Sequence, residues 1–531
     1  MRTHNTFSTP STLRIAIACL VVATTLGCSG SASDEPSASV LDSASLDTGN
    51  DTGNDTDNDT DYDTDNDTTS TAEPDQLAQV PLDWSTCDVN IECATIEVPS
   101  DYDDLMAGVF RLPLVRHLAR DPERRIGSLL VNPGGPGAGA VDMAYGAVDW
   151  FGDEVLDRFD IVAWDPRGTG GSIPAIDCTD SMDPLFGLDP SPDDDSELEA
   201  LVTAAEQYVN DCFLNSPGVL EYVGTEAAAR DIDTIRRALG EETISYLGFS
   251  YGTVLGSVWV TLFPDTVRAA VLDAAVDPEL GYLNGLIDQA RGFEESLDAF
   301  LDDCDERGCS FVRDGETARE AIVSILGSLE TDPIPNADGR PDTGPGVAAV
   351  GIANALYGSY SWPYLEEALS AVRDGDGGLL LAEYDMYFGG WDGGHTDDFV
   401  DAYFGIFCLD RDRDVTVDEV LDARVELTEV APILGQGWLT EMLVCAQWLQ
   451  PARPIPMVST DTEVPVLVVG STGDAATPIE GTRNMARVLG DSMLLVVESD
   501  DHTSYGANAC ATRIIDDYLI DLRQISDDET C

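Results

Sequence analysis

A serine stands in a turn that would expose its hydroxyl group. Residues 248–252 read Gly-Phe-Ser-Tyr-Gly, after an apolar run at 244–247 and before a helical stretch at 253–263. Glycines on both sides of Ser250 permit the sharp strand-to-helix turn that presents a nucleophilic serine. The alternative is that Ser250 only caps the following helix. The strand before it and the helix after it favour a nucleophile.

Such a serine needs a base that removes its proton. The chain has four histidines, of which His4 lies in the leader. His502, in Asp-Asp-His-Thr-Ser-Tyr-Gly at 500–506, follows the last predicted strand, and we predict that it is the general base. His117 is expected on the surface among arginines. His395 is expected in a solvated loop of a helical insertion.

The acid that orients the base should lie between serine and histidine in chain order, at the end of a strand. Asp474 follows the apolar run 464–469 in a Gly-Ser-Thr-Gly-Asp turn, and we predict that it is this acid. The rival is Asp277, which follows the run 269–272.

Acyl transfer also needs two backbone N–H groups that face the developing negative oxygen. We predict that one belongs to Tyr251, directly after the nucleophile. The other is predicted at Gly135, in Asn-Pro-Gly-Gly-Pro-Gly at 132–137, because consecutive glycines let the main chain approach a substrate. This chemistry requires neither a metal ion nor an organic cofactor.

These residues need a scaffold, and short apolar runs separated by helical stretches predict one. Continuous apolar runs indicate a mostly parallel sheet covered by helices on both faces. Between 281 and 455 the pattern becomes helical, which predicts an inserted, largely helical cap. The core is then expected at 80–280 and 456–531. The six runs lie at 126–131, 159–164, 244–247, 269–272, 464–469 and 493–497.

The N-terminus carries an export signal. Arginines precede an apolar run at 15–27, which is too short to span a bilayer and is typical of a signal peptide, predicted at 1–27. Residues 25–28 resemble a bacterial lipobox, which would lipidate Cys28. Cleavage by an ordinary signal peptidase is the alternative. We therefore expect an exported protein, either a cell-envelope lipoprotein or a secreted enzyme.

Residues 28–79 hold the lipidation site and then an Asp/Thr/Asn-rich stretch with few apolar residues. Such a segment cannot bury enough surface to fold, so we predict a disordered acidic linker. Calcium binding by its alternating aspartates is a second interpretation.

The net charge restricts the possible binding partners, and the number of cysteines predicts disulfides. The chain has 99 acidic and 27 basic residues, a formal net charge of -72, and no lysine. That field repels nucleic acid and anionic lipid, so no nucleic-acid partner is expected, and membrane contact is expected only through a lipid anchor. Ten cysteines follow Cys28, enough for five disulfides, and pairing neighbours in sequence order is the simplest arrangement.

The motifs together resemble the tripeptidyl aminopeptidase-like (TAP-like) branch of the α/β-hydrolase fold, serine peptidases related to prolyl aminopeptidases. The resemblance covers nearly all of 84–531 and includes Trp-Asp-Pro-Arg-Gly-Thr-Gly at 164–170. It implies disulfides Cys408–Cys445 and Cys510–Cys531. The prolyl enzymes commonly have histidine where this chain has Pro133, which favours the tripeptidyl branch.

The resemblance implies an exported serine exopeptidase that releases short peptides, tripeptides in that branch, from free N-termini of a peptide substrate. Such an enzyme needs a carboxylate for the substrate amine, and Asp410 in the cap is our candidate. Two alternatives stay open: an esterase or lipase-like hydrolase acting on small esters, and a non-catalytic envelope binding protein. The oligomeric state is left open.

Overall fold

The parallel sheet predicted from the apolar runs is present. The computed structural model describes residues 82–337, 339–395, 397–526 and 529–531. The signal peptide, Cys28, the linker at 28–79 and the calcium interpretation therefore lie outside the described residues. Within the described ranges, no helix is both long and apolar enough to cross a bilayer.

Ten strands form one sheet in the order β1-β2-β3-β5-β4-β6-β7-β8-β9-β10. The first three strands pair antiparallel, β3 is antiparallel to β5, and every pair from β5 to β10 is parallel. The strands are β1 (Ser85–Asp88), β2 (Ile91–Pro99), β3 (Val109–His117), β4 (Gly127–Asn132), β5 (Phe159–Trp164), β6 (Ile244–Phe249), β7 (Val267–Asp273), β8 (Val466–Ser471), β9 (Ser492–Val497) and β10 (Glu529–Thr530).

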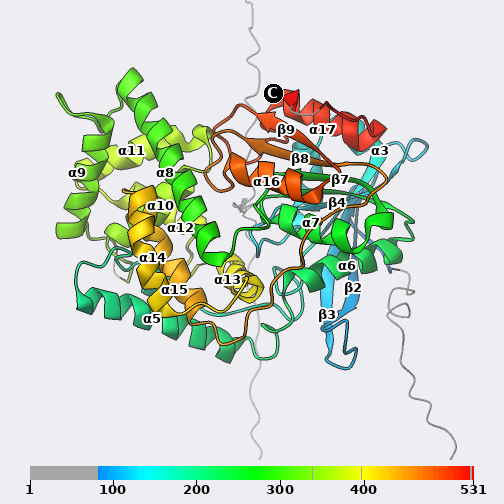
Figure 1. Ribbon diagram of the computed structural model, residues 1–531, viewed down its shortest axis with the longest axis horizontal. Coiled ribbons are helices and arrows are strands. Elements are labelled where there is room, and N and C mark those ends of the chain that lie inside the picture. The colour runs from blue at the N-terminus through cyan, green and yellow to red at the C-terminus, as the bar shows by residue number, and fades with distance from the viewer. Residues whose placement is uncertain (1–81, 338, 396, 527–528) are drawn as a thin grey trace, which may run out of the picture. The chain divides into compact units, whose positions relative to one another are not determined.

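Burial explains why the central strands read as unbroken apolar runs. Every residue of β4, β5, β6 and β8 is buried. Alternate side chains face opposite layers: Leu129 and Ile161 pack with α1, α3 and α17, whereas Leu130 and Val162 pack with α6 and α7 (Figure 1). The predicted α/β-hydrolase fold is confirmed. The core helices are α1 (Val141–Tyr145), α2 (Ala147–Trp150), α3 (Asp153–Arg158), α6 (Thr225–Leu239), α7 (Tyr251–Leu262), α16 (Ile479–Leu489) and α17 (Ala509–Asp521).

Between β7 and β8 the described residues form only helices, turns and two isolated bridges, and Figure 1 shows these helices gathered beside the sheet. They are α8 (Tyr282–Arg307), α9 (Ala318–Thr331), α10 (Pro345–Ala355), α11 (Trp362–Arg373), α12 (Gly378–Tyr387), α13 (Phe399–Asp410), α14 (Val417–Val430) and α15 (Leu439–Ala446).

A second segment, from between β5 and β6, also packs with this helical insertion, although it lies within the range 80–280 that we predicted as core. It contains α4 (Asp183–Phe186) and α5 (Asp195–Asn215). Gln447, just after α15, donates to the Val202 carbonyl at 3.1 Å, and Arg424 of α14 donates to the Pro192 carbonyl at 3.1 Å. Helix α5 is amphipathic on its own, so its pattern does not reveal which layer it will cover.

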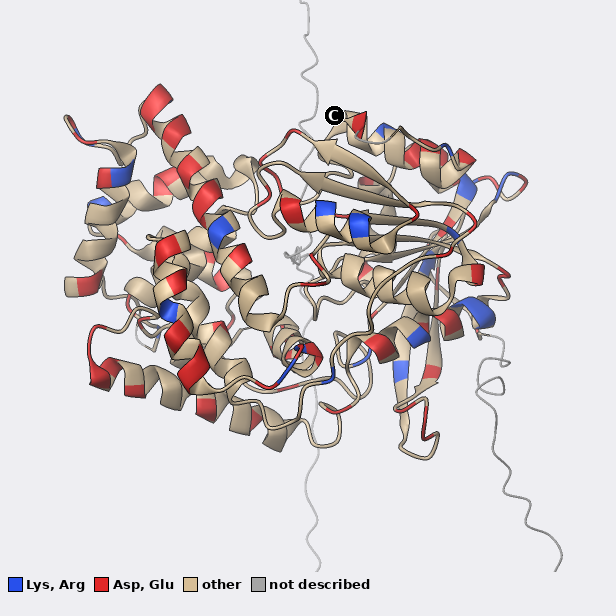
Figure 2. Cartoon of the chain, in the orientation of Figure 1, with Lys and Arg blue, Asp and Glu red and all other residues tan. Residues whose placement is uncertain are grey.

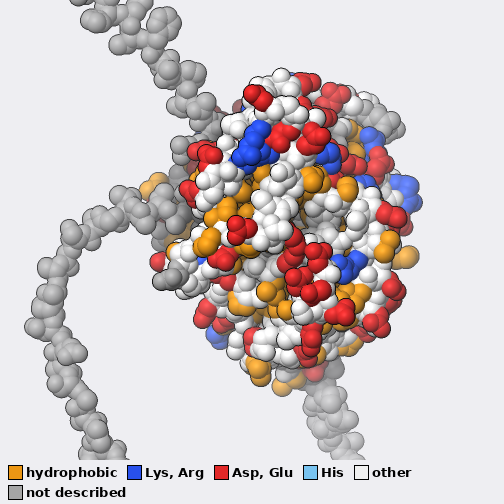
Figure 3. Space-filling model, turned by 90° about the vertical axis from the view of Figure 1, so that its left-hand side faces the viewer, with side chains coloured by type: hydrophobic (Ala, Val, Ile, Leu, Met, Phe, Trp, Pro, Cys, Tyr) orange, Lys and Arg blue, Asp and Glu red, His pale blue; other side chains and the backbone are white. Residues whose placement is uncertain are grey.

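The acidic excess lies mainly on outer surfaces. Figure 2 shows Asp and Glu along α5, α8 and α14, with few arginines between them. Figure 3 faces the insertion and shows carboxylates mixed with small apolar patches. Spreading the charge over a solvated surface limits the self-repulsion that it causes.

Five disulfides join the ten cysteines of the described chain in sequence order, as the simplest arrangement predicted. They are Cys87–Cys93, Cys178–Cys212, Cys304–Cys309, Cys408–Cys445 and Cys510–Cys531. The sequence separations are short, between 5 and 37 residues, so each bond fixes a local loop rather than distant layers.

The arginine of the 164–170 motif stabilises the fold from inside. Arg167 is fully buried and forms two hydrogen bonds to Asp231, at 2.8 and 2.6 Å. It also donates to the carbonyls of Pro99, Ser100 and Tyr222. The guanidinium therefore ties β2 and two loops to helix α6.

We expect Arg167→Met to lower the free energy of unfolding by about 3–5 kcal/mol, because it leaves the buried Asp231 carboxylate without its counter-charge. Urea unfolding measures this. Arg111→Met is the matched control: the Arg111–Glu97 pair is 55% exposed on both sides, and an exposed pair contributes about 0–1 kcal/mol. Equal losses in the two variants would contradict the structural role of Arg167.

Candidate active site

Ser250 occupies a strained turn between β6 and α7. Its φ is 54°, in the left-handed region that non-glycine residues rarely adopt. Both flanking glycines are required: a Cβ on Gly248 would lie 2.4 Å from the Gly252 carbonyl oxygen, and one on Gly252 would lie 2.8 Å from Asn132 Oδ1. The Ser250 side chain makes no capping hydrogen bond to α7, so the helix-cap alternative finds no support.

His502 and Asp474 form a buried pair at the ends of neighbouring strands. His502 Nδ1 lies 2.9 Å from both carboxylate oxygens of Asp474. The backbone N–H of His502 donates to the Tyr357 carbonyl at 2.8 Å, and the rings of the two residues pack edge to face. Because Nδ1 faces a carboxylate, its proton is best placed there, which leaves Nε2 unprotonated and able to accept a proton.

The Asp474 carboxylate is itself held in place. Thr477 Oγ1 donates to Oδ2 at 2.8 Å, and the N–H groups of Ala476 and Thr477 donate to Oδ1, both at 2.9 Å. The rival acid Asp277 is engaged elsewhere: its Oδ1 accepts from Asn484 Nδ2 at 2.6 Å and from the Glu279 N–H at 2.8 Å. Of the two acids, the structure brings Asp474 to the histidine.

A third aspartate, which sequence reasoning missed, supports the histidine loop. Asp273 ends β7 and accepts from the N–H of Tyr505 at 2.7 Å and of Ser504 at 3.0 Å. Burial raises the pKa of Asp273 to about 6, and the hydrogen bonds from Tyr505 and Ser504 oppose that rise. An acidic residue closing an otherwise apolar strand was the available signal.

The two predicted oxyanion donors lie beside the serine. Gly135, Tyr251 and Ser250 line one cavity of about 340 Å³. The N–H of Gly134 donates to Asn132 Oδ1 at 3.1 Å, whereas the N–H groups of Gly135 and Tyr251 have no hydrogen-bond partner among the described residues. Two backbone donors are thus left for a ligand.

A smaller chamber of about 70 Å³, here called the side chamber, adjoins this cavity. Ser250, His502, Tyr403 and Glu441 are among the residues that line it. Tyr403 Oη donates to Glu441 Oε2 at 2.9 Å, and burial raises the pKa of Glu441 to about 7 against the effect of that bond. Sequence reasoning missed Glu441 because nothing distinguishes it from the many other acids of the insertion.

Helix α13 forms the wall of both spaces. Phe399, Tyr403, Phe407 and Asp410, spaced four, four and three residues apart, share one face of the helix and line one or both of the cavities. The backbone of α13 approaches the Gly-rich loop so closely that a Cβ on Gly137 would lie 2.4 Å from the Phe399 carbonyl oxygen.

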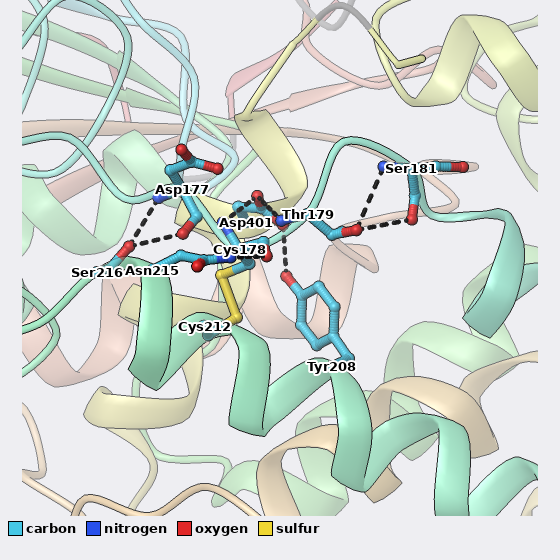
Figure 4. The surroundings of a disulfide bond; sticks show 9 residues. All are labelled: Asp177, Cys178, Thr179, Ser181, Tyr208, Cys212, Asn215, Ser216 and Asp401. Carbon is cyan, nitrogen blue, oxygen red and sulfur yellow. Dashed lines mark hydrogen bonds between the residues drawn. A yellow bond between two sulfur atoms is a disulfide. The ribbon is translucent and has the colours of Figure 1, made fainter. Parts of the chain in front are cut away.

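Hydrogen bonds and disulfides fix this helix in place. Figure 4 shows Asp401 of α13 beside the Cys178–Cys212 disulfide. Its carboxylate accepts from the N–H of Cys178 at 2.7 Å, the N–H of Thr179 at 3.2 Å and Tyr208 Oη at 2.8 Å. At the other end, the Cys408–Cys445 disulfide joins α13 to α15.

Asp410, the predicted amine ligand, does line the larger cavity, but its carboxylate already has donors. Thr225 donates to it from its N–H at 3.1 Å and from Oγ1 at 2.5 Å, and Thr225 Oγ1 also contacts Tyr251 Oη. Burial raises the pKa of Asp410 to about 7, and the bonds from Thr225 oppose the rise. Thr225 therefore links the Asp410 carboxylate to Tyr251, the residue that follows Ser250.

Two expectations about histidines are wrong. His117 is buried, because β3 pairs on both sides and is an inner strand rather than an edge. The side chain of His395 is 4% exposed; its Nδ1 accepts from the Met182 N–H at 3.0 Å, and its ring packs against Phe388. Each histidine is covered by residues that lie far away in the sequence, so the polarity of its own segment does not reveal that it is buried.

Five buried or half-buried carboxyls, each with a pKa raised to about 6 or 7, predict how stability depends on pH. Burial raises them to about 6 for Asp273, Asp401 and Asp516 and to about 7 for Asp410 and Glu441. Their unfolded values are about 4. Between about pH 4 and 7 the folded chain therefore holds protons that the unfolded chain has lost, so stability falls as pH rises through that window.

We expect a higher thermal unfolding midpoint at about pH 5.5 than at about pH 8, at constant ionic strength. Glu441→Gln removes one of the five groups and should flatten the slope, whereas the exposed Glu426→Gln should not. A midpoint that climbs steadily from pH 5.5 to 8 would show that these carboxyls do not carry the pH dependence.

The strand order, the serine turn and the buried histidine–aspartate pair define a serine hydrolase of the α/β-hydrolase fold. Residues 127–311 match the family described as alpha/beta hydrolase fold, and residues 431–531 match the family described as TAP-like protein. The chain belongs to the TAP-like α/β-hydrolases and is a serine hydrolase of that family.

Three relatives illustrate the range of names in this family. Serine protease Hip1 of Mycobacterium tuberculosis is 35% identical over 477 residues, covering 85% of this chain and 90% of the relative. Carboxylesterase B of the same organism is 34% identical over 444 residues, covering 81% and 84%. Tripeptidyl aminopeptidase of Streptomyces lividans is 28% identical over 486 residues, covering 86% and 87%.

Proposed function

We propose that this protein is an exported serine exopeptidase that releases short peptides, in particular tripeptides, from free N-termini. Ser250 is the nucleophile, His502 the general base and Asp474 the acid that orients it. The observation that carries the proposal is the buried His502–Asp474 pair, whose histidine lines the side chamber together with Ser250. The relative named tripeptidyl aminopeptidase supports the substrate class.

The chemistry follows from the geometry. Ser250 Oγ attacks the carbonyl carbon of the scissile bond and gives its proton to His502 Nε2, while Asp474 stabilises the imidazolium. The N–H groups of Tyr251 and Gly135 donate to the oxyanion. The imidazolium then protonates the leaving amine, the C–N bond breaks, and an acyl-enzyme forms. Water, deprotonated by His502, attacks the ester, and the released proton returns to Ser250.

Export is supported by the disulfides. The described chain holds five disulfides. Disulfides are usual in proteins that fold in an oxidising compartment and rare in a reducing cytosol. The signal peptide at 1–27 and lipidation of Cys28 are the proposed route to the cell envelope. Mass spectrometry of the mature N-terminus tests this, since a diacylglyceryl group on Cys28 and a free N-terminus further along give different masses.

An esterase is the second candidate, and one observation favours it: a relative named carboxylesterase B is 34% identical. The same nucleophile, base and oxyanion donors would cleave small esters. A non-catalytic binding protein is the third alternative, against which the complete set of catalytic groups argues. Failure of Ser250 to react with a phosphonate that labels active serines would revive it.

One comparison decides between peptidase and esterase. We expect kcat/KM for a tripeptidyl anilide with a free N-terminus to exceed that for its acetylated form by about tenfold or more, roughly 1.4 kcal/mol of discrimination. The reason is that an exopeptidase binds the substrate amine. Equal rates for the two anilides, or cleavage of esters alone, would contradict the exopeptidase function and leave the hydrolase chemistry standing.

A further inference from the structure

The side chamber contains a carboxylate that the hydrolytic chemistry does not use. Glu441 of α15 lines it together with Ser250 and His502, so the carboxylate faces the same enclosed space as the nucleophile. Its backbone is tied down, because the Glu441 carbonyl accepts from Tyr282 Oη at 3.1 Å. Among the described residues, its side chain accepts a hydrogen bond only from Tyr403 Oη.

Fully buried carboxylates near the site have more donors than the half-buried Glu441. Asp401 accepts from two N–H groups and a tyrosine hydroxyl, and Asp273 accepts from two N–H groups. Glu294 of α8 accepts from the N–H groups of Ile433 and Leu434. Glu441 Oε1 has no hydrogen-bond partner among the described residues, and no arginine of the described chain forms an ion pair with it.

Glu441 is half-buried, and a carboxylate withdrawn from water without a cation is costly, which favours a counter-charge that arrives with a ligand. The walls of the chamber fit a cation. Trp150, Tyr357, Tyr387 and Phe399 line it, and aromatic rings attract an ammonium group through their negative faces. Its volume of about 70 Å³ corresponds to about two water molecules, at about 30 Å³ each, so it has room for a small polar group.

We propose that the side chamber binds an ammonium group of the substrate, held by the Glu441 carboxylate and oriented by Tyr403. This deepens the proposed function, and it rests on Ser250 being the nucleophile. Two sources supply the same chemistry: the α-ammonium of a free N-terminus, and the side-chain ammonium of a lysine just before the scissile bond. Glu441 takes the place that the sequence had assigned to Asp410, whose carboxylate is occupied by Thr225.

The test compares Glu441→Gln with wild type on three anilides: trialanyl with a free N-terminus, acetyl-trialanyl, and acetyl-dialanyl-lysyl. Glutamine keeps the shape and an acceptor for Tyr403 but removes the charge. We expect kcat/KM to fall by about tenfold to a hundredfold for one of the two ammonium-bearing substrates, the loss expected for a charge-assisted hydrogen bond, and to change less than about twofold for acetyl-trialanyl. Glu426→Gln, an exposed position in the same insertion, is the matched control and should change none of them.

The pattern of loss identifies the source. A loss confined to the free trialanyl anilide assigns the chamber to the α-ammonium, and a loss confined to the lysyl anilide assigns it to the side chain. In the second case the exopeptidase function fails while the chamber proposal stands. Equal losses on all three substrates, or no loss on any, overturn the proposal.

Three further measurements distinguish a lost charge from a folding defect. Labelling by an active-serine phosphonate should proceed in Glu441→Gln at the wild-type rate, because that reagent carries no ammonium. Glu441→Asp, which keeps the charge on a shorter side chain, should recover part of the lost kcat/KM. Competitive inhibition by n-butylammonium, with n-butanol as the neutral control, should weaken at least tenfold in Glu441→Gln for the ammonium alone; an unchanged ammonium inhibition constant would also overturn the proposal.

Discussion

Replacing Ser250 with alanine should lower kcat/KM by about 10⁴- to 10⁶-fold, because the acyl-enzyme can no longer form. The backbone should be unaffected, since the Ser250 side chain makes no capping hydrogen bond to α7. Hydrolysis of the trialanyl anilide measures the rate, and loss of phosphonate labelling shows that the same residue reacts. The residual rate should come from the oxyanion donors and substrate binding.

A control separates a lost nucleophile from a disturbed turn. Ser257, in the same helix α7, is buried and donates to the Val254 carbonyl at 2.7 Å. Ser257→Ala should keep activity within about threefold while costing about 1 kcal/mol of stability. If Ser250→Ala kept a tenth or more of the wild-type activity, Ser250 could not be the nucleophile.

Replacing Asp474 with asparagine should lower kcat by about 10⁴-fold, because an amide favours the wrong tautomer of the histidine. Asparagine Oδ1 can still accept from the N–H groups of Ala476 and Thr477, and its amide NH2 group can donate to the Thr477 hydroxyl oxygen, so the turn should keep its shape. KM should change little, because the variant affects proton transfer more than binding.

The rival acid provides the matched control. Asp277→Asn removes a carboxylate that contacts Asn484 and Glu279 rather than His502, so we expect kcat to change less than about threefold. The reverse pattern, with Asp277→Asn inactive and Asp474→Asn active, would assign the acid to the end of β7 instead.

The predicted residues came together because their signals are local. The turn at 248–252 needs glycines at fixed offsets, and the two close approaches, at Gly248 and Gly252, show why. Asp474 and His502 follow consecutive apolar strands, and parallel strands end at the same edge of a sheet. Their proximity therefore follows from the order of strands, which the sequence displays.

Other features depended on segments far apart in the chain. Helix α5 packs with the insertion although it lies between β5 and β6 in the sequence. The Asp410 carboxylate accepts a hydrogen bond from Thr225. The side chains of His117 and His395 are buried by residues from other parts of the sequence, which the polarity of the neighbouring residues does not predict. Glu441 stands out because it lacks a second donor, and that can be judged only after every neighbour is placed.

The sequence by itself therefore determined the sheet, the serine turn, the order of the proposed catalytic residues and the pairing of neighbouring cysteines. Each of these rests on periodicity or spacing within a few residues, or on the order of elements along the chain. The tertiary structure alone decided which acidic residues of the described chain are buried, which of them have donors, and which line the cavities beside Ser250. The physical reason is that burial and hydrogen bonding depend on contacts between distant segments, and composition leaves such contacts undetermined.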